Sequence, residues 1–261
     1  MAEHGPKRVD VATSCFKQAI VFQTQGKYEE ALELYTQSLA IWIAEYGPEH
    51  TSVASSYNNM AAVFKCQGKY AQALKQFRKS LTIKVNLHGP DHPSVATSYN
   101  NIGTVFQSEG KYDKALQLYK LALEICIKAY GPDHRSVALS YNNMAIVFDA
   151  QGRYDKALAL HRRSVELNIK AHGAEHTSVA DSYRNMASAC SSLGKYEEAL
   201  ELLRKNLDIN IKVHGPEHSS VADSYNNMVE VLKSQGKHEE ALALLDNVEF
   251  LKKLEAMNRL S

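Results

Sequence analysis

The sequence predicts an all-α fold in which six helix–turn–helix repeats pack one after another into a solenoid. Two observations predict it. A glycine and an Ala-Leu pair each recur every 42 residues, and the apolar residues inside each repeat recur at spacings of three and four. That spacing is the period of a helix with one buried face. The recurring glycines are Gly26, Gly68, Gly110, Gly152, Gly194 and Gly236.

Each repeat divides into two helices at its glycine. In the second repeat, Val53, Tyr57 and Phe64 lie on one stripe, which predicts a first helix that ends near Gly68. A glycine there suits the left-handed conformation that often ends a helix. A second helix then runs from about Tyr70 to the next Gly-Pro pair. Neither helix could bury its stripe alone, so neighbouring pairs must pack together.

The repeats fill the chain. We place them approximately at 5–46, 47–88, 89–130, 131–172, 173–214 and 215–247, followed by a C-terminal capping helix over 248–261. The whole of 1–261 is therefore predicted to be one array. Small residues, Ala61, Gly103, Ala145 and Ala187, stand where the two helices of a pair must approach closely.

Composition and charge exclude several classes of protein. Thirty basic and 29 acidic residues leave a formal net charge of +1, which argues against a nucleic-acid-binding surface. The four cysteines form no CxxC pair, which indicates reduced thiols. The N-terminus resembles no secretory signal, and no apolar run is long enough to span a membrane. We expect a cytoplasmic protein with no membrane association.

One histidine per repeat raises the question of a metal site. His50, His92, His134, His176 and His218 keep the 42-residue step. Equivalent positions in a solenoid lie about 10 Å apart, too far to share a zinc ion that needs ligands within about 2.3 Å. The HxxxH pairs within single turns alternate with Tyr at their first position, as at Tyr46 and Tyr130. We therefore predict structural linkers, with His92 or Asp91 as a helix cap, and no metal or other cofactor.

No catalytic motif is present. The sequence lacks a nucleophile elbow, a phosphate loop and a dinucleotide fingerprint. Paired glutamates open the second helix in three repeats, at 29–30, 197–198 and 239–240, where negative charge favours the helix dipole. The serine found in every repeat is interpreted as a packing residue. We predict a protein that is not an enzyme.

The repeats resemble a known family. GKYEEALELY (26–35) is similar to the tetratricopeptide repeat, and the 42-residue period, the GPDH turn (89–92) and SYNNMAAVF (56–64) resemble the repeats of kinesin light chains. The resemblance covers residues from Gly5 to about Asn247 and implies a right-handed solenoid. Kinesin light chains carry a heptad segment before their repeats. This sequence shows no such segment before its repeats, so we do not expect a complete light chain.

The resemblance also places a binding groove along the first helices. Asn is a mediocre helix former, so its recurrence at one helical phase needs a reason. An amide can donate to and accept from an extended peptide backbone. The alternative is a hydrogen-bond ladder between helices, and both can hold. The predicted groove residues are Asn58, Asn59, Asn100, Asn101, Asn142, Asn143, Arg184, Asn185, Asn226 and Asn227, with Leu139 and Ile146 in the most apolar stretch.

Two departures from the repeat pattern give further expectations. Arg184 interrupts the Asn pairs, either as one partner of an internal ion pair or as a selector of an acidic peptide residue. Trp42 occupies a position held elsewhere by Lys84, Cys126 and two asparagines. We interpret that position as exposed on the convex face.

The predicted function is a protein–protein interaction scaffold or adaptor that holds an extended peptide of a protein partner, with a monomer favoured. Two alternatives are a structural repeat protein that self-associates and a regulatory sensor of a small peptide or metabolite. The groove lacks the Lys or Arg that clamps a partner's C-terminal carboxylate, so we do not expect recognition of chaperone tails.

Overall fold

The computed structural model describes residues 5–245, which contain helices and turns but no strand. The chain divides into two compact halves, Met1–Ala129 and Tyr130–Ser261. Each half is described by itself, so one continuous right-handed array stays a prediction. Within each half the helices pack as sequential pairs, and the predicted all-α class is confirmed.

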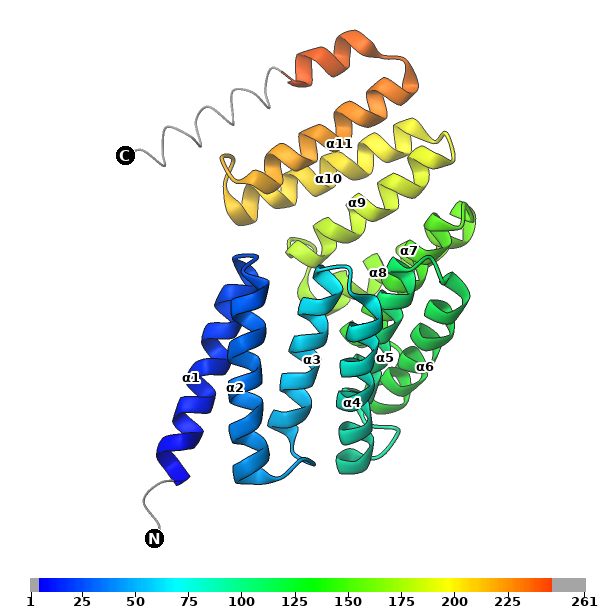
Figure 1. Ribbon diagram of the computed structural model, residues 1–261. Helices are drawn as coiled ribbons and strands as arrows, with labels where there is room; N and C mark the ends of the chain where they lie inside the picture. The colour runs from blue at the N-terminus through cyan, green and yellow to red at the C-terminus, as the bar shows by residue number, and fades with distance from the viewer. Residues whose placement is uncertain (1–4, 246–261) are drawn as a thin grey trace, which may run out of the picture. The chain divides into compact units, whose positions relative to one another are not determined.

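The N-terminal half contains three helix pairs, in which α1 to α4 lie side by side in chain order (Figure 1). Its helices are α1 (Gly5–Thr24), α2 (Tyr28–Tyr46), α3 (Thr51–Cys66), α4 (Tyr70–His88), α5 (Pro93–Ser108) and α6 (Tyr112–Tyr130).

The C-terminal half repeats the arrangement. Its helices are α7 (Arg135–Ala150), α8 (Tyr154–His172), α9 (Thr177–Ser192), α10 (Tyr196–His214) and α11 (Ser219–Gln235). Residues 238–245 are also helical and begin the second helix of the sixth repeat. The predicted capping helix over 248–261 lies outside the described residues.

The predicted stripes form the core. Val53, Val95, Val137 and Val179 have no exposed surface, and the small residues at the pair interface are equally buried. At Gly103 the paired helices approach so closely that an added Cβ would lie 2.5 Å from Cε1 of Tyr119. The prediction that small residues permit close contact between paired helices is therefore confirmed.

The turn inside each repeat closes on its glycine. Gly68 has φ of 71°, a conformation that glycine adopts without strain. Its N–H donates to the Lys65 carbonyl at 2.9 Å, and the Lys69 N–H donates to the Phe64 carbonyl at 2.8 Å. This pattern is a Schellman motif, which satisfies two carbonyls at the end of α3.

Candidate peptide-binding grooves

The recurring histidine caps the first helix of five repeats: α3, α5, α7, α9 and α11. Nδ1 of His92 accepts a hydrogen bond from the Ser94 N–H at 3.2 Å, and the His92 backbone is extended, as an N-cap requires. The same bond, at the same 3.2 Å, caps α3, α7, α9 and α11 through His50, His134, His176 and His218. The predicted structural role is confirmed, and His92 rather than Asp91 is the cap.

The first residue of each turn packs on the capping ring. His88 stacks on His92 with 4.5 Å between ring centroids, and Tyr130 stacks on His134 at 4.2 Å. Either ring type performs this role, which explains why Tyr and His alternate there. Among residues 5–245 there is no group of three or more His, Cys, Asp or Glu side chains that could hold a metal ion.

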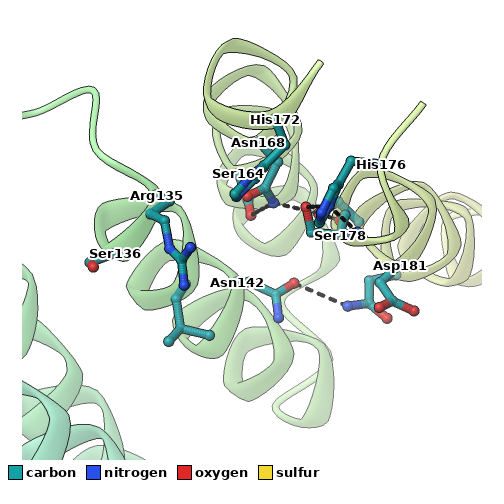
Figure 2. Close-up of a pocket in the computed structure, with 12 residues that line it drawn as sticks. Arg135, Ser136, Asn142, Ser164, Asn168, His172, His176, Ser178 and Asp181 are labelled. Atoms are coloured by element: carbon teal, nitrogen blue, oxygen red, sulfur yellow. Dashed lines mark hydrogen bonds between the residues drawn. The ribbon is translucent and has the colours of Figure 1, made fainter. Parts of the chain in front are cut away.

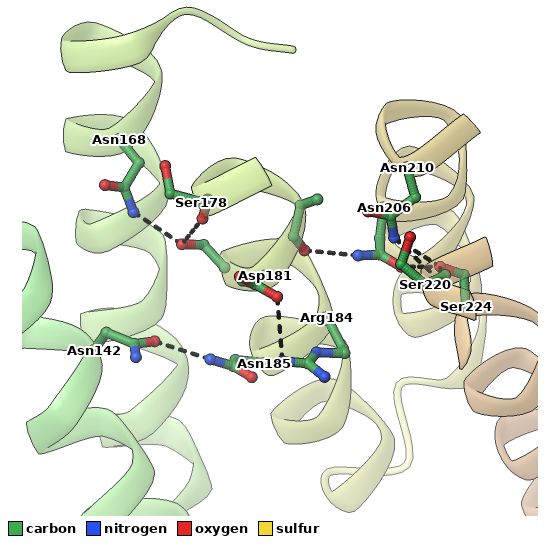
Figure 3. Close-up of polar contacts among 12 residues, drawn as sticks. Asn142, Asn168, Ser178, Asp181, Arg184, Asn185, Asn206, Asn210, Ser220 and Ser224 are labelled. Carbon is green, nitrogen blue, oxygen red and sulfur yellow. Dashed lines mark hydrogen bonds and ion pairs between the residues drawn. The ribbon is translucent and has the colours of Figure 1, made fainter. Parts of the chain in front are cut away.

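The asparagines join successive first helices. In the N-terminal half, Nδ2 of Asn101 donates to Oδ1 of Asn58 at 2.8 Å. In the C-terminal half, Nδ2 of Asn185 donates to Oδ1 of Asn142 at 3.0 Å (Figure 3). The alternative of bonding between helices therefore occurs at both sites. One such bond leaves further donor and acceptor capacity on each amide.

Arg184 interrupts this ladder. It stands where Asn142 stands one repeat earlier, and it pairs with Asp181 at 3.2 Å (Figure 3). Both side chains are about half exposed or more, so the pair contributes only about 0–1 kcal/mol. In the part of the chain that the structure describes, no hydrogen bond engages the side chain of Asn227, which is the next ladder amide.

Two recesses lie along these helices in the C-terminal half. The recess between α7 and α9 has a volume of about 430 Å³, and Asn142, Asn168, Asp181 and Asn185 are among its lining residues (Figure 2). Amide, hydroxyl and imidazole groups make up most of its lining. It is a polar groove, suited to hydrogen bonding.

The second recess, between α9 and α11, has a volume of about 460 Å³. Arg184, Asn185, Asn227 and Glu230 line it, together with small serine side chains and Leu203 of α10. It therefore contains the interruption of the ladder and the amide that this interruption leaves without a partner.

The predicted site residues differ in accessibility. Leu139 is 53% exposed and lines the recess between α7 and α9, whereas Ile146 is half-buried and lines neither recess. Arg184 is exposed, Asn100 is buried, and the remaining eight are half-buried: Asn58, Asn59, Asn101, Asn142, Asn143, Asn185, Asn226 and Asn227.

The prediction for Trp42 is wrong. Its side chain is only 7% exposed, and with Tyr35 and Leu39 it forms a buried stripe at helical spacing. The polar residues at equivalent positions misled the interpretation, because they are also buried or half-buried and are satisfied by hydrogen bonds. The stripe spacing was the signal that could have identified the position.

We call the position that Trp42 occupies within its repeat the groove-floor position. It comprises Trp42, Lys84, Cys126, Asn168 and Asn210. Its polar members reach a buried serine of the following first helix: Lys84 Nζ donates to Ser98 Oγ at 3.0 Å, and Nδ2 of Asn168 donates to Ser182 Oγ at 3.0 Å (Figure 3). Burial lowers the pKa of Lys84 and raises the pKa of Cys126. The floor of the groove therefore changes its chemistry from repeat to repeat.

Comparison with known families gives the class of protein. The tetratricopeptide repeat model matches residues 10–84, 52–127, 94–170, 150–210 and 178–246, which together cover most of the chain. The chain belongs to the tetratricopeptide repeat family. A search of curated proteins finds no match to the sequence.

Similar solved structures are kinesin light chain-like. The crystal structure of BtubC (BKLC) from P. vanneervenii is 18% identical, with a TM-score of 0.70 over 98% of this chain and 92% of that one. A Podosopora anserina protein of nearly identical repeats, described as a kinesin light chain candidate, is 25% identical, with a TM-score of 0.67 over 78% of this chain and 97% of its own. In residues 5–245, no helix is long and apolar enough to cross a membrane.

Proposed function

We propose that this protein is a non-enzymatic interaction scaffold that holds an extended peptide of a partner protein in the grooves along its first helices. The tetratricopeptide fold is generally a module for protein–protein interaction. The observation that carries the proposal is the recess between α9 and α11, where the half-buried Asn227 has no hydrogen-bond partner among the described residues.

The chemistry of the grooves favours a peptide backbone as the ligand. An amide side chain donates and accepts at once, as a peptide group does, so a regular series of amides can follow an extended chain. The serines that line the recess between α9 and α11 leave room beside these amides. Recognition of the backbone leaves the choice of peptide to the side chains that enter the recesses.

The Asn227→Ala variant tests peptide recognition separately from hydrogen bonding between helices. Because the Asn227 amide has no hydrogen-bond partner among residues 5–245, Asn227→Ala should leave the unfolding midpoint unchanged. If the amide binds peptide, the same change should weaken binding by roughly 2- to 10-fold, the effect of one hydrogen bond of about 0.5–1.5 kcal/mol. Asn101→Ala removes the bond to Asn58 and should lower stability.

The experiment begins with peptides selected from a random display library, whose affinities are then measured by calorimetry. Asn86→Ala is the matched control, because Asn86 is an exposed amide that pairs with Glu49 outside the recesses. Failure to select any peptide, or selected peptides that bind the Asn227→Ala variant with unchanged affinity, would contradict the proposal.

Arg184 tests selectivity in the same recess. We propose that it selects an acidic peptide residue, since its exposed pair with Asp181 is weak and easily exchanged. Arg184→Ala should weaken only those peptides that carry an acid at one position, and less so as salt rises. If the variant loses stability but keeps its affinity and salt dependence, the arginine serves the ion pair alone.

Self-association and the sensing of a small peptide or metabolite remain the alternatives. Light scattering of the purified chain across concentration distinguishes a monomeric scaffold from a self-associating one. We also propose a cytoplasmic location and no catalytic activity, both of which follow from the sequence.

A further inference from the structure

The first groove of the chain, between α1 and α3, has aromatic residues at two positions that are polar in the recess between α7 and α9. Phe16 stands at the position of the first ladder amide, which is Asn58 one repeat later and Asn142 three repeats on. Trp42 stands at the groove-floor position, which is Asn168 three repeats on. Two amides are therefore replaced by two aromatic rings.

These rings border a recess of about 180 Å³, which is also lined by Thr51, Ser52 and Ser55. An apolar cavity of about 150 Å³ accepts one benzene molecule, so the recess is large enough for one phenyl ring. Its counterpart between α7 and α9 measures about 430 Å³ and has polar residues at the same two positions. The first recess is smaller and aromatic.

The two walls are held in place before any ligand arrives. The ring of Phe16 packs edge-on against Tyr35 with 5.4 Å between centroids, and Trp42 stacks on Tyr46 at 5.7 Å. Tyr46 in turn stacks on His50, the cap of α3. A site whose walls are already fixed loses little entropy when it binds.

The lining also indicates the charge of the ligand. Its five residues carry no charge, and their only polar side-chain groups, apart from the indole N–H of Trp42, are hydroxyls. Burying an unpaired charge there would be costly, whereas a neutral aromatic ring can pack against Phe16 and Trp42. The hydroxyls at the rim can hydrogen-bond the backbone on either side of that ring.

We infer that the first groove is an anchor site for one aromatic side chain, Phe or Tyr, of the bound peptide. This inference rests on the proposed function and assigns a side-chain preference to one end of its grooves. Phe16 forms the wall of the anchor site, and Trp42 forms its floor.

The test uses the fluorescence of Trp42, the only tryptophan of the chain. N-acetylphenylalanine amide should change its emission saturably, with a dissociation constant on the order of 1 mM, as expected for one side chain bound without the rest of a peptide. N-acetylalanine amide should give no saturable change. Equal responses to the two amides, or none to either, would overturn the inference.

A substitution drawn from the chain itself provides the variant. Phe16→Asn installs the residue that four of the other five repeats carry at this position, so it should fold, as circular dichroism can verify. It should weaken binding of N-acetylphenylalanine amide at least 10-fold. Leu121→Ala, at an exposed apolar residue of α6 outside the recesses, is the control and should leave binding unchanged. Unchanged binding by a folded Phe16→Asn variant would refute the role of the aromatic wall.

Two further outcomes keep this inference distinct from the proposed function. If selected peptides bind but Trp42 does not respond to the phenyl amide, only the anchor site is refuted. If the phenyl amide binds but no peptide does, the scaffold function fails instead. A change in Trp42 emission with protein concentration alone would mean that a second copy fills the recess, which would overturn the assignment to a peptide.

Discussion

The stacked histidines of the turn between α8 and α9 predict a stability that falls on mild acidification. Each cap needs an unprotonated Nδ1, because a protonated ring presents a donor where the serine N–H requires an acceptor. A positive charge at a helix N-terminus is also unfavourable. In three turns a second imidazole lies 4.4–4.5 Å away, so that double protonation would bring like charges together.

The sign of the effect is supported by His172, which stacks on His176. Partial burial, together with the charges of His176 and Arg135, lowers the pKa of His172. A histidine whose pKa is lowered by folding prefers its neutral form in the folded state. Its contribution to stability is therefore present above the ordinary histidine range and lost as pH falls through its lowered folded pKa.

The contribution of each cap to the free energy of unfolding follows from its hydrogen bond to the helix N-terminus. Loss of a side-chain cap costs about 1 kcal/mol, so His92→Ala should lower the free energy of unfolding by roughly that amount at neutral pH. His92→Asn keeps an acceptor that does not titrate and should cost little. The five caps together are worth on the order of 5 kcal/mol.

The assay is urea unfolding followed by circular dichroism at about pH 7.5 and about pH 5, where imidazoles change charge. The wild type is compared with His172→Tyr, which installs the ring that Tyr46 and Tyr130 supply at this position in other repeats. The variant should lose less stability on acidification than the wild type, because it lacks the imidazole whose pKa folding lowers. If both lose the same amount, or if His92→Ala is without effect, the reasoning about the caps and their stacked histidines is refuted.

Three other substitutions or reagents test the packing. Lys84→Asn should raise the melting temperature, because it removes a charge that burial disfavours and installs the residue used at two other floor positions; a lower melting temperature would show that the lysine stabilises the fold. Gly103→Ala should lower the free energy of unfolding in urea by roughly 1 kcal/mol, since overpacking against Tyr119 exceeds the gain in helix propensity. Iodoacetamide should label the exposed Cys66 rapidly, whereas Cys190, whose pKa burial raises to about 11, should react only on unfolding, as mass spectrometry can verify.

Much of the fold could be predicted from the sequence, because the same local signals recur in successive repeats. The glycine step, the Ala-Leu pair and the apolar stripe placed the second helix of the second repeat at about Tyr70, and the structure begins α4 there. The role of the histidines followed from their spacing alone. Local propensity and periodicity were sufficient for these features.

The site could be predicted only in part, since contacts between repeats depend on how one helix is shifted along another. Asn58 bonds to Asn101, a residue at the neighbouring phase of the next repeat, and no periodicity specifies that offset. The sequence pattern misplaces Trp42, because polar residues at its position in other repeats suggest exposure to solvent. A hydrogen bond to a buried serine, as Lys84 makes to Ser98, satisfies such residues without solvent.

The groove-floor position varies between repeats, whereas the residues that determine the fold vary little. The caps, turns and core stripes recur in almost every repeat, whereas the floor holds an indole, an ammonium group, a thiol and two amides. The fold therefore accommodates very different side chains at one site while the surrounding helices keep their arrangement. Under the proposed function, Trp42 and Asn168, the two of these residues that line recesses, are where a designer would begin to redirect the array toward a new ligand.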